Sequence, residues 1–362
     1  MKKIVVWGYW VRNFGDDLFL KSLVNIIKDR KEEILIYICC KKEYEEYYKE
    51  MGVKVFVEDS LLNKITTKIL RIFGKPDPYF IKCKKNDFFV MLGGSLFAEN
   101  KNSNTEKQQL LNLNCAVKRT YNSFIIGSNF GTYKSEEFLR SYTKLFSKVK
   151  DISFRDKNSY DLFASKLNNI RYCLDIALEG KWEEKNNDEN IESKNIAISM
   201  IDLETRSELK KFQNDYEKIF ITICQHHIDN NEKIFLLSFC KKEGDNNVYD
   251  RIIKKISKPE MVKIVEYTDI YSICNIIKNC QKIYATRFHA IMMGLYYNKN
   301  IVPFIYNSKS LNALKTYTND EFYSVDLMSI ENYCVQDIIK CEQIIRLETI
   351  DDSQFSELLK SL

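Results

Sequence analysis

Residues 88–94 read FFVMLGG, an unbroken apolar run that stops at a pair of glycines. A strand that is apolar at every position, rather than at every second one, is buried on both faces. Such strands are typical of parallel sheets that carry helices on each side, and Gly93 and Gly94 mark the end of this one. The run therefore predicts a central strand of an α/β sheet.

Short apolar runs of the same kind recur on both sides of this stretch, and helical patterns separate them. In the pattern at 17–28, for example, Leu20, Leu23 and Ile27 fall on one face of a helix. We expect strands at residues 4–7, 34–39, 53–57, 88–92, 123–127, 152–154, 195–200, 233–239, 261–265, 282–285 and 301–305. This alternation predicts an α/β fold.

Residues 179–194 (EGKWEEKNNDENIESK) interrupt the alternation with an almost entirely polar stretch. A single core rarely grows to the size of a 362-residue chain, so two domains are expected. We predict two Rossmann-like domains facing a cleft. The N-terminal domain is expected at 1–180, a linker at 181–194, and the C-terminal domain at 195–362, ending in a helical tail.

The overall composition excludes several classes of protein. The formal charge of +5 is too mild to indicate nucleic-acid binding, and no apolar run is long enough to span a membrane. The start, MKKIVVWGYWV, lacks a small-residue cleavage site, so we expect a buried strand there rather than a signal peptide. The 11 Cys form no C-x-x-C pair, which predicts buried free thiols, no zinc site and a cytoplasmic protein.

The first segment with a candidate for binding follows the first predicted strand. Ligands of doubly wound folds bind at the carboxyl ends of the strands. Asn13 and Gly15 stand there at the start of a helix, whose N–H groups can bind an anion or a sugar hydroxyl. The alternative is that the next two residues, Asp16 and Asp17, only favour the helix dipole.

Two glycine-containing loops also follow predicted strands. They contain Gly93, Gly94 and Ser95, and Gly127, Ser128 and Gly131. Each loop is either a backbone cradle for an anion or a plain tight turn. The G-x-G-x-x-G pattern is absent, so a dinucleotide-binding fingerprint is not predicted.

Basic residues end three further strands. Arg155 follows one strand directly, and Arg287 and Lys309 follow two others. Arginine at such a position often clamps phosphate or carboxylate with its planar fork. For Arg155 the alternative is a surface pair with Asp156. We expect Arg155, Arg287 and Lys309 to converge on one anion site.

One of the 3 His in the chain stands beside these basic residues. His289 lies at a strand-to-helix junction, two residues after Arg287, so both side chains can point at one ligand. A histidine there supplies a titratable proton donor. His226 and His227 lie in a helical pattern without a partner signal, and we expect them at the surface.

The ordered set of these segments resembles the polysaccharide pyruvyl transferase family over about residues 4–315. The segments that carry the resemblance are 13–17, 93–94, 127–131, 152–156, 287–290 and 306–309. The resemblance implies a GT-B-like fold and a bacterial enzyme of exopolysaccharide or cell-wall biosynthesis. Members transfer pyruvate from phosphoenolpyruvate to two hydroxyls of one sugar and form a cyclic ketal.

The resemblance also assigns roles. It places binding of phosphoenolpyruvate, the donor substrate, on Arg155, Arg287, His289 and Lys309. His289 is the expected proton donor, and no metal or cofactor is implied. The chemistry of this transfer also needs a base for the hydroxyl protons, and the candidates on the acceptor side are Asp16, Asp17 and Glu99. The chain departs from the family pattern at Ser95, where a third glycine is frequent.

Two alternatives to a pyruvyl transferase remain open. One keeps the fold but uses a nucleotide-sugar donor, which makes the protein a glycosyltransferase whose loops hold a diphosphate. The other is a carbohydrate-binding relative without activity. The joint presence of Arg155, Arg287, His289 and Lys309 argues against the second.

Residues 61–75 predict a basic amphipathic helix. Apolar residues form one face at 61, 62, 65, 69, 72 and 73, and basic residues form another at 64, 68, 71 and 75. Such a helix can lie on the inner face of an anionic membrane, which would suit a lipid-linked oligosaccharide acceptor. The alternative, which we favour from sequence, is that the apolar face packs on the sheet of its own domain.

Overall fold

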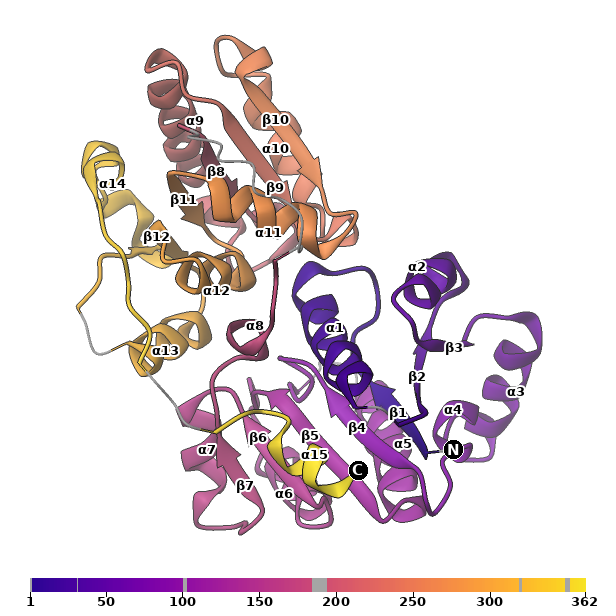
Figure 1. Ribbon diagram of the computed structural model, residues 1–362. Coiled ribbons are helices and arrows are strands. Elements are labelled where there is room, and N and C mark those ends of the chain that lie inside the picture. The colour runs from indigo at the N-terminus through magenta and orange to yellow at the C-terminus, as the bar shows by residue number, and fades with distance from the viewer. Residues whose placement is uncertain (1, 31, 100–102, 184–193, 319–320, 349–351) are drawn as a thin grey trace. The chain divides into compact units, whose positions relative to one another are not determined.

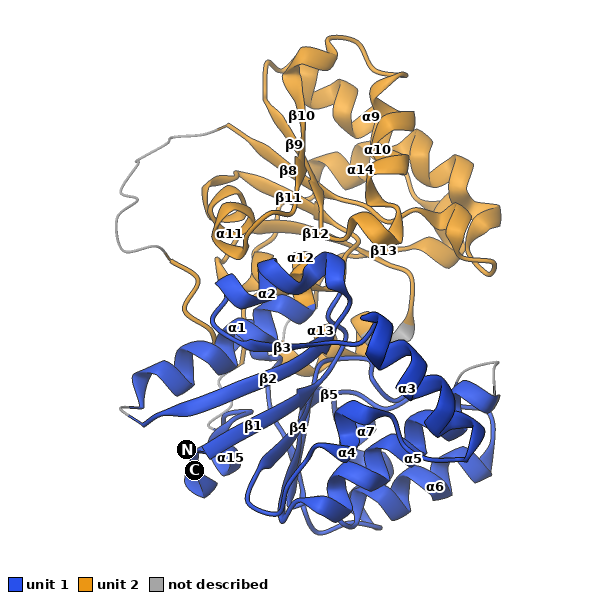
Figure 2. Ribbon diagram, turned by 90° about the vertical axis from the view of Figure 1, so that its right-hand side faces the viewer, with its two compact units in different colours: residues 1–12, 16–179, 350–362 blue, residues 13–15, 180–349 orange. Residues whose placement is uncertain are grey.

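The computed structural model describes residues 2–30, 32–99, 103–183, 194–318, 321–348 and 352–362. It divides into two compact units, coloured separately in Figure 2. The first unit consists of residues 1–12, 16–179 and 350–362, and the second of residues 13–15 and 180–349. Of the expected linker, residues 184–193 lie outside the described residues.

The first unit is a parallel sheet with helices on both faces (Figure 1). Its seven strands run in the order β3-β2-β1-β4-β5-β6-β7. Their bounds are β1 (Lys2–Trp7), β2 (Ile34–Cys40), β3 (Lys54–Val57), β4 (Phe88–Leu92), β5 (Asn122–Ser128), β6 (Asp151–Phe154) and β7 (Ile170–Tyr172). The helices are α1 (Phe14–Asp29, of which the first two residues group with the second unit), α2 (Glu45–Glu50), α3 (Leu61–Ile72), α4 (Pro78–Ile81), α5 (Ser103–Arg119), α6 (Glu136–Phe146), α7 (Lys157–Ala164), α8 (Ile176–Glu179) and α15 (Ser356–Ser361).

The second unit repeats this architecture with a six-stranded parallel sheet in the order β10-β9-β8-β11-β12-β13. Its strands are β8 (Ile196–Ser199), β9 (Ile234–Ser238), β10 (Val262–Glu266), β11 (Lys282–Ala285), β12 (Asn300–Ile305) and β13 (Val325–Asp326). Its helices are α9 (Gln213–Asp229), α10 (Asp245–Ile253), α11 (Ile270–Asn279), α12 (Phe288–Tyr296), α13 (Ser308–Tyr317) and α14 (Val335–Lys340).

The core of each unit explains why the apolar runs form strands. All five residues of β4 are buried, as are all residues of β6, β8 and β11, because helices cover both faces of the sheet. Aromatic side chains fill the core of the first unit; Phe130, for example, lies 5.0 Å from Phe163 between ring centroids. The predicted α/β architecture with a fully buried central strand is therefore confirmed.

The cysteines are free thiols, and most of them are buried. Burial raises the pKa of thiols such as Cys83 and Cys224 to about 12, so they are protonated and weakly nucleophilic near neutral pH. Cys334 is the exposed one.

The prediction that His227 lies at the surface is wrong, whereas His226 is exposed. The His227 ring is buried on the inner face of α9. Its Nδ1 lies 2.6 Å from a carboxylate oxygen of Glu232, and its Nε2 lies 3.0 Å from the hydroxyl of Tyr284. Burial lowers the pKa of His227, although the Glu232 carboxylate opposes this shift. Partners from a turn and from β11 are not visible in the helical pattern of the sequence.

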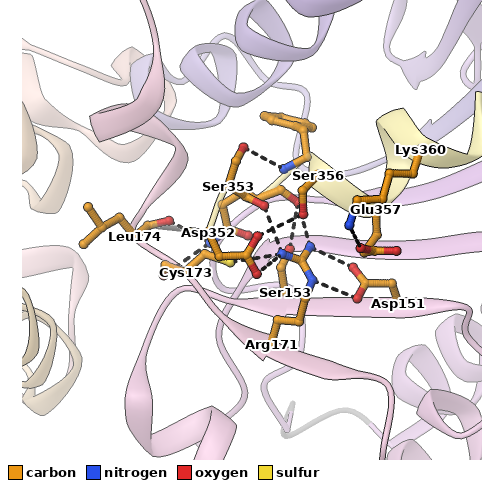
Figure 3. Close-up of polar contacts among 12 residues, drawn as sticks. Asp151, Ser153, Arg171, Cys173, Leu174, Asp352, Ser353, Ser356, Glu357 and Lys360 are labelled. Carbon is orange, nitrogen blue, oxygen red and sulfur yellow. Dashed lines mark hydrogen bonds and ion pairs between the residues drawn. The ribbon is translucent and has the colours of Figure 1, made fainter. Parts of the chain in front are cut away.

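The C-terminal segment differs from the prediction that residues 195–362 form one domain. Residues 350–362 group with the first unit. Figure 3 shows why: the guanidinium of Arg171 on β7 binds Asp151 on β6 and reaches Asp352 at 2.6 Å and the carbonyl of Ser353 at 3.0 Å. Gln354 is fully buried and accepts a hydrogen bond from the N–H of Gly127 at 2.9 Å. Polar pairing, which has no periodic signal, anchors this segment.

Glu179 should make the anchored segment less stable as the pH rises. It accepts hydrogen bonds from the N–H of Gln354 at 2.9 Å and the hydroxyl of Ser353 at 2.7 Å. Burial raises the pKa of Glu179 from 4.5 to about 7, so in this interval the folded state holds a proton that the unfolded state releases. This contribution to stability is complete below the unfolded pKa and is lost as the pH rises through the folded one. We expect a loss of about 1–3 kcal/mol.

Hydrogen exchange of residues 352–362, corrected for its intrinsic pH dependence, measures this effect. Protection in the unsubstituted protein should fall between about pH 5 and about pH 8. Glu179→Gln, which stays neutral, should remove most of the fall. Glu357→Gln, which alters an outer carboxylate of α15 paired with Lys360, should retain it. An unchanged fall in Glu179→Gln would contradict the assignment.

The expectation that the apolar face of 61–73 packs on its own sheet is also wrong. Every apolar residue of that face is at least half exposed, from Ile69 at 50% to Leu61 at 79%. No residue of α3 is buried. Within the described part of the chain, none of the helices combines the length and apolar character needed to cross a bilayer.

Candidate functional site

Three neighbouring strands of the first unit bring separate sequence segments together at their carboxyl ends. β4, β5 and β6 are adjacent in the sheet. The N–H of Asn129 donates to the carbonyl of Gly94 at 2.8 Å, and the N–H of Arg155 donates to the carbonyl of Ser128 at 3.0 Å. Because parallel strands end at one edge, Gly94, Asn129 and Arg155 are neighbours despite their distance in sequence.

Arg155 is buried there rather than exposed in a pair with Asp156. One terminal nitrogen lies 2.7 Å from a carboxylate oxygen of Asp175, and the other lies 2.9 Å from the side-chain oxygen of Asn129. The Asp156 side chain instead caps α7 through the N–H of Ser159. Pairing with a fully buried carboxylate holds the guanidinium in one orientation.

Gly94 leaves the space that the Arg155 guanidinium occupies. A Cβ at position 94 would lie 2.4 Å from a terminal nitrogen of Arg155. The hydroxyl of the exposed Ser95 donates to the same Asn129 oxygen at 3.1 Å. We call Gly94, Ser95, Asn129, Arg155 and Asp175 the first-unit site.

Several backbone N–H groups of the glycine loops already have acceptors within the protein. The N–H of Gly93 donates to the carbonyl of Ile126 at 3.3 Å, and that of Gly131 to the carbonyl of Phe97 at 2.8 Å. The N–H of Gly127 binds Gln354, and the hydroxyl of Ser128 binds the Gly93 carbonyl at 2.6 Å. These groups hold the two loops to each other and to the C-terminal segment, so they are not available to an anion.

The second unit places Arg287 and His289 at the point where its strand order reverses. β8 and β11 are adjacent, and their helical connections lead to opposite sides of the sheet. Arg287 precedes α12 and His289 lies in its first turn. Ligands of open α/β sheets bind at such switch points, where helix N-termini favour negative charge. Lys309 lies in the first turn of α13, after the neighbouring β12; its side chain lies outside the described residues.

Two carboxylates that follow β9 bind the buried Arg287. Its Nε lies 3.2 Å from Asp245, and its terminal nitrogens bind Asp245 and Glu243. Asp245 is fully buried and also accepts the N–H of Phe239 at 2.9 Å. Burial raises the pKa of Asp245 despite Arg287. Burial also tends to raise the pKa of Glu243. Its pairing with Arg287 and Arg206 outweighs burial, so the pKa of Glu243 is lowered.

Residues 13–15 belong to the second unit and complete this arrangement. The N–H of Phe14 donates to the carbonyl of Phe239 at 3.1 Å, and the Asn13 amide donates to Glu243 at 3.3 Å. A Cβ at Gly15 would lie 1.8 Å from Nδ1 of His289. Gly15 is therefore a glycine because the imidazole ring occupies the position of a side chain. We call Gly15, Glu243, Asp245, Arg287 and His289 the second-unit site.

The three candidate bases have different surroundings. Asp17 is fully buried, and the hydroxyls of Tyr47 and Tyr48 donate to it at 3.0 and 2.9 Å. Glu99 accepts hydrogen bonds from the hydroxyl and N–H of Ser135, and these bonds lower its pKa, which makes it a weaker base. Asp16 is partly exposed in the first turn of α1.

A family model of polysaccharide pyruvyl transferases matches residues 13–308, from the Asn13 segment to the first residue of α13. The chain belongs to the polysaccharide pyruvyl transferase family. The matched range covers most of each unit and includes both candidate sites. The family resemblance expected from the sequence is thereby confirmed.

Solved structures show which fold this family member has. A UDP-GlcNAc 2-epimerase from Methanocaldococcus jannaschii, in complex with UDP-GlcNAc and UDP, has a TM-score of 0.61 at 10% identity, covering 100% of this chain and 99% of that one. S. aureus MnaA with UDP has a TM-score of 0.53 at 12% identity, covering 83% and 78%. Anabaena Alr3699/HepE in complex with UDP-glucose has a TM-score of 0.52 at 12% identity, covering 94% and 91%. The predicted two-domain GT-B-like fold is confirmed.

Sequence reasoning missed three carboxylates of the two sites: Asp175, Glu243 and Asp245. All three follow strands, at the edge where the basic residues were sought. A buried arginine requires a carboxylate partner, so knowing that Arg155 and Arg287 are buried would have directed the search to nearby carboxylates. Sequence alone did not show that Arg155 and Arg287 are buried. Their meeting at one anion site stays a prediction.

Gly15→Ala in this pyruvyl transferase family member should impair activity without unfolding the chain. Alanine favours a helix more than glycine does, but its Cβ would force the His289 ring to move. A displacement of about 1 Å in a reacting group can lower a rate about 100-fold. The measurement is kcat for pyruvyl transfer, and circular dichroism checks that the variant is folded. Asn25→Ala, further along α1, is the control substitution and should keep its activity. Full activity of a folded Gly15→Ala variant would contradict the role of the contact.

Proposed function

We propose that this protein transfers pyruvate from phosphoenolpyruvate to two hydroxyls of one sugar, in a surface polysaccharide or its lipid-linked precursor, and forms a cyclic ketal. The observation that carries the proposal is the second-unit site. A half-buried histidine in the first turn of α12 follows a buried arginine at the switch point of the sheet. Membership of the family supports a transferase acting in polysaccharide biosynthesis.

The charge of the donor fits groups of the second unit. Phosphoenolpyruvate carries a phosphate and a carboxylate, about three negative charges near pH 7. The N-termini of α12 and α13 lie at the ends of adjacent parallel strands, β11 and β12, and both favour an anion. Arg287 is already paired with two carboxylates, so it contributes a fixed orientation more than excess charge. Arg155 is likewise paired with Asp175, so we assign the additional charge to Lys309.

The reaction itself needs one proton donor and one acceptor. A proton adds to the methylene carbon of phosphoenolpyruvate, and positive charge develops at the neighbouring carbon. A sugar hydroxyl attacks that carbon, the bond to the phosphate oxygen breaks, and a second hydroxyl closes the ring. The sugar hydroxyls release two protons. One replaces the proton that the acid gave to the methylene carbon, and the other leaves on the phosphate. No other reactant is consumed.

His289 is the residue we assign to the proton transfer. Imidazole changes its charge near neutral pH and can both donate and accept a proton. The helix N-terminus and the contact with Gly15 restrict the position of the ring. Among the acceptor-side bases we favour Asp16, because Asp17 is fully buried and Glu99 is held by the segment before α6.

The deciding experiment supplies phosphoenolpyruvate with free and lipid-linked glycan acceptors. We expect phosphate release that depends on the acceptor, and an acceptor product heavier by pyruvate less one water. A parallel panel of nucleotide sugars tests the alternative, a glycosyltransferase, because several proteins of similar fold were solved with UDP or UDP-sugars. Transfer from a nucleotide sugar without consumption of phosphoenolpyruvate would reject the proposal.

A further inference from the structure

The α3 helix lies at the outside of the first unit (Figure 2), and the side chains of its apolar stripe are exposed. The stripe consists of large side chains that are 50–79% exposed: Leu61, Leu62, Ile65, Ile69, Ile72 and Phe73. Scattered exposed apolar residues are ordinary, but a continuous stripe on one helix marks an interaction surface. We call these six residues the α3 stripe.

Polar contacts fix both ends of α3 to the first unit. At its start, the hydroxyl of Ser60 caps the helix and the amide of Asn63 donates to the carbonyl of Val57 at 2.6 Å. At its end, the Arg71 guanidinium makes two hydrogen bonds of 2.8 Å to Asp77. The helix is therefore positioned firmly while the α3 stripe contributes little to the core.

The flank of the stripe is basic. Lys64, Lys68 and Lys75 are exposed and make no ion pair in the part of the chain that the structure describes. Residues 61–72 contain no acidic side chain. Arg71 is the exception among the basic residues, because Asp77 already neutralises it.

We propose that α3 docks the protein on an anionic membrane surface, with the α3 stripe at the acyl boundary and the three lysines among the headgroups. An apolar stripe beside a row of cations is the pattern of helices that lie in the membrane interface. A second copy of this chain fits less well. A two-fold contact through α3 would place the same lysines opposite each other with no acidic partner on the helix.

This docking has a consequence for the acceptor, which rests on the proposed transferase function. α3 follows β3, so it begins at the carboxyl edge of the sheet. The first-unit site lies at the ends of β4, β5 and β6, at the same edge of that sheet. A membrane-bound protein would therefore hold this edge near the lipid surface. The acceptor class we infer is a sugar linked to a lipid carrier.

Sedimentation with vesicles tests the docking without any substrate. The probes are vesicles of phosphatidylcholine alone and of phosphatidylcholine with phosphatidylglycerol, each at low and high salt. We expect binding to the anionic vesicles that weakens as salt screens the charges. Removing three lysines, each worth about fivefold near an anionic surface, should lower the partition coefficient on the order of 100-fold. The variant is Lys64→Glu with Lys68→Glu and Lys75→Glu; Arg71 is left intact because it anchors the helix.

A charge-matched control separates docking from general attraction. Lys118→Glu with Lys144→Glu and Lys254→Glu alters exposed lysines elsewhere and has the same net charge. It should bind almost as the unsubstituted protein does. Equal losses in the two triple variants would overturn the assignment to α3.

A second variant tests the apolar half of the surface. Leu62→Ser with Ile65→Ser and Ile69→Ser changes exposed residues only, so the fold should persist. It should lose vesicle binding even at low salt. If the protein instead binds no anionic vesicles at low salt and is a dimer in light scattering that this variant dissociates, a second copy covers α3 and the proposal is wrong. Pyruvyl transfer to a soluble acceptor is measured separately, so a failure of docking is distinct from a failure of the proposed function.

Discussion

His289→Ala is expected to lower turnover of phosphoenolpyruvate by about 10²–10⁴-fold while the chain stays folded, because the general acid is lost. The ring is partly buried, with its Nε2 inside the protein, and alanine removes bulk beside the Gly15 backbone rather than adding it, so the substitution should introduce no clash. The loss should appear in kcat for acceptor-dependent phosphate release. His289→Gln, which keeps a polar side chain but cannot transfer the proton, should be about as inactive.

The matched control for this substitution is His226→Ala. His226 is exposed on α9, outside both candidate sites, so its loss should not change kcat. A folded His289→Ala protein with near-normal kcat would show that another group moves the proton.

Arg287→Met should destabilise the second unit by about 3–5 kcal/mol, because it leaves the fully buried carboxyl group of Asp245 without its cation. Urea unfolding followed by circular dichroism measures the change. Arg206→Met is the control, since Arg206 is partly exposed and lies 3.5 Å from Glu243. Its pair should be worth about 0–1 kcal/mol.

A double-mutant cycle distinguishes the lost charge pair from lost packing. Asp245→Asn removes the buried charge but can still accept the N–H groups of Phe239 and Cys240. In the Arg287→Met background, Asp245→Asn should therefore restore part of the stability. If the two substitutions were simply additive, the pair would not be the source of the loss. A catalytic role of Arg287 alone predicts inactivity without destabilisation.

The parallel sheets were predictable because burial on both faces produces continuous apolar runs. The run at 88–92 forms β4, and 282–285 forms β11 with identical bounds. Glycine and basic residues after these strands were predictable as site candidates for the same reason, since parallel strands end at one edge. The side-chain contacts inside each unit were not predictable from the sequence. Gly94 beside Arg155 and Gly15 beside His289 join segments far apart in the chain, and their spacing carries no periodic signal.

Amphipathic patterning misled the interpretation of α3. The pattern at 61–73 correctly predicts a helix with one apolar face, but not what that face contacts. Its exposure depends on polar anchors at both ends, Asn63 with Val57 and Arg71 with Asp77, which the pattern does not reveal. The prediction for His227 failed in the opposite way, since this polar residue was expected at the surface and is buried. Burial is tolerated because Glu232 and Tyr284 pair with both ring nitrogens.

The sequence by itself determined the two α/β units and the sheet edges that bear the candidate residues, because strands buried on both faces leave continuous apolar runs that end at recognisable residues. The ordered set of strand-end motifs also determined the family. The tertiary structure decided which charges are paired, which glycines make room for a functional side chain, and where residues 350–362 belong. The physical reason is that ion pairs and close backbone approaches join residues tens to hundreds of positions apart. The interaction energy of Arg155 with Asp175, or of Arg171 with Asp352, depends on distance and burial in the fold, and neither quantity is encoded in the local pattern.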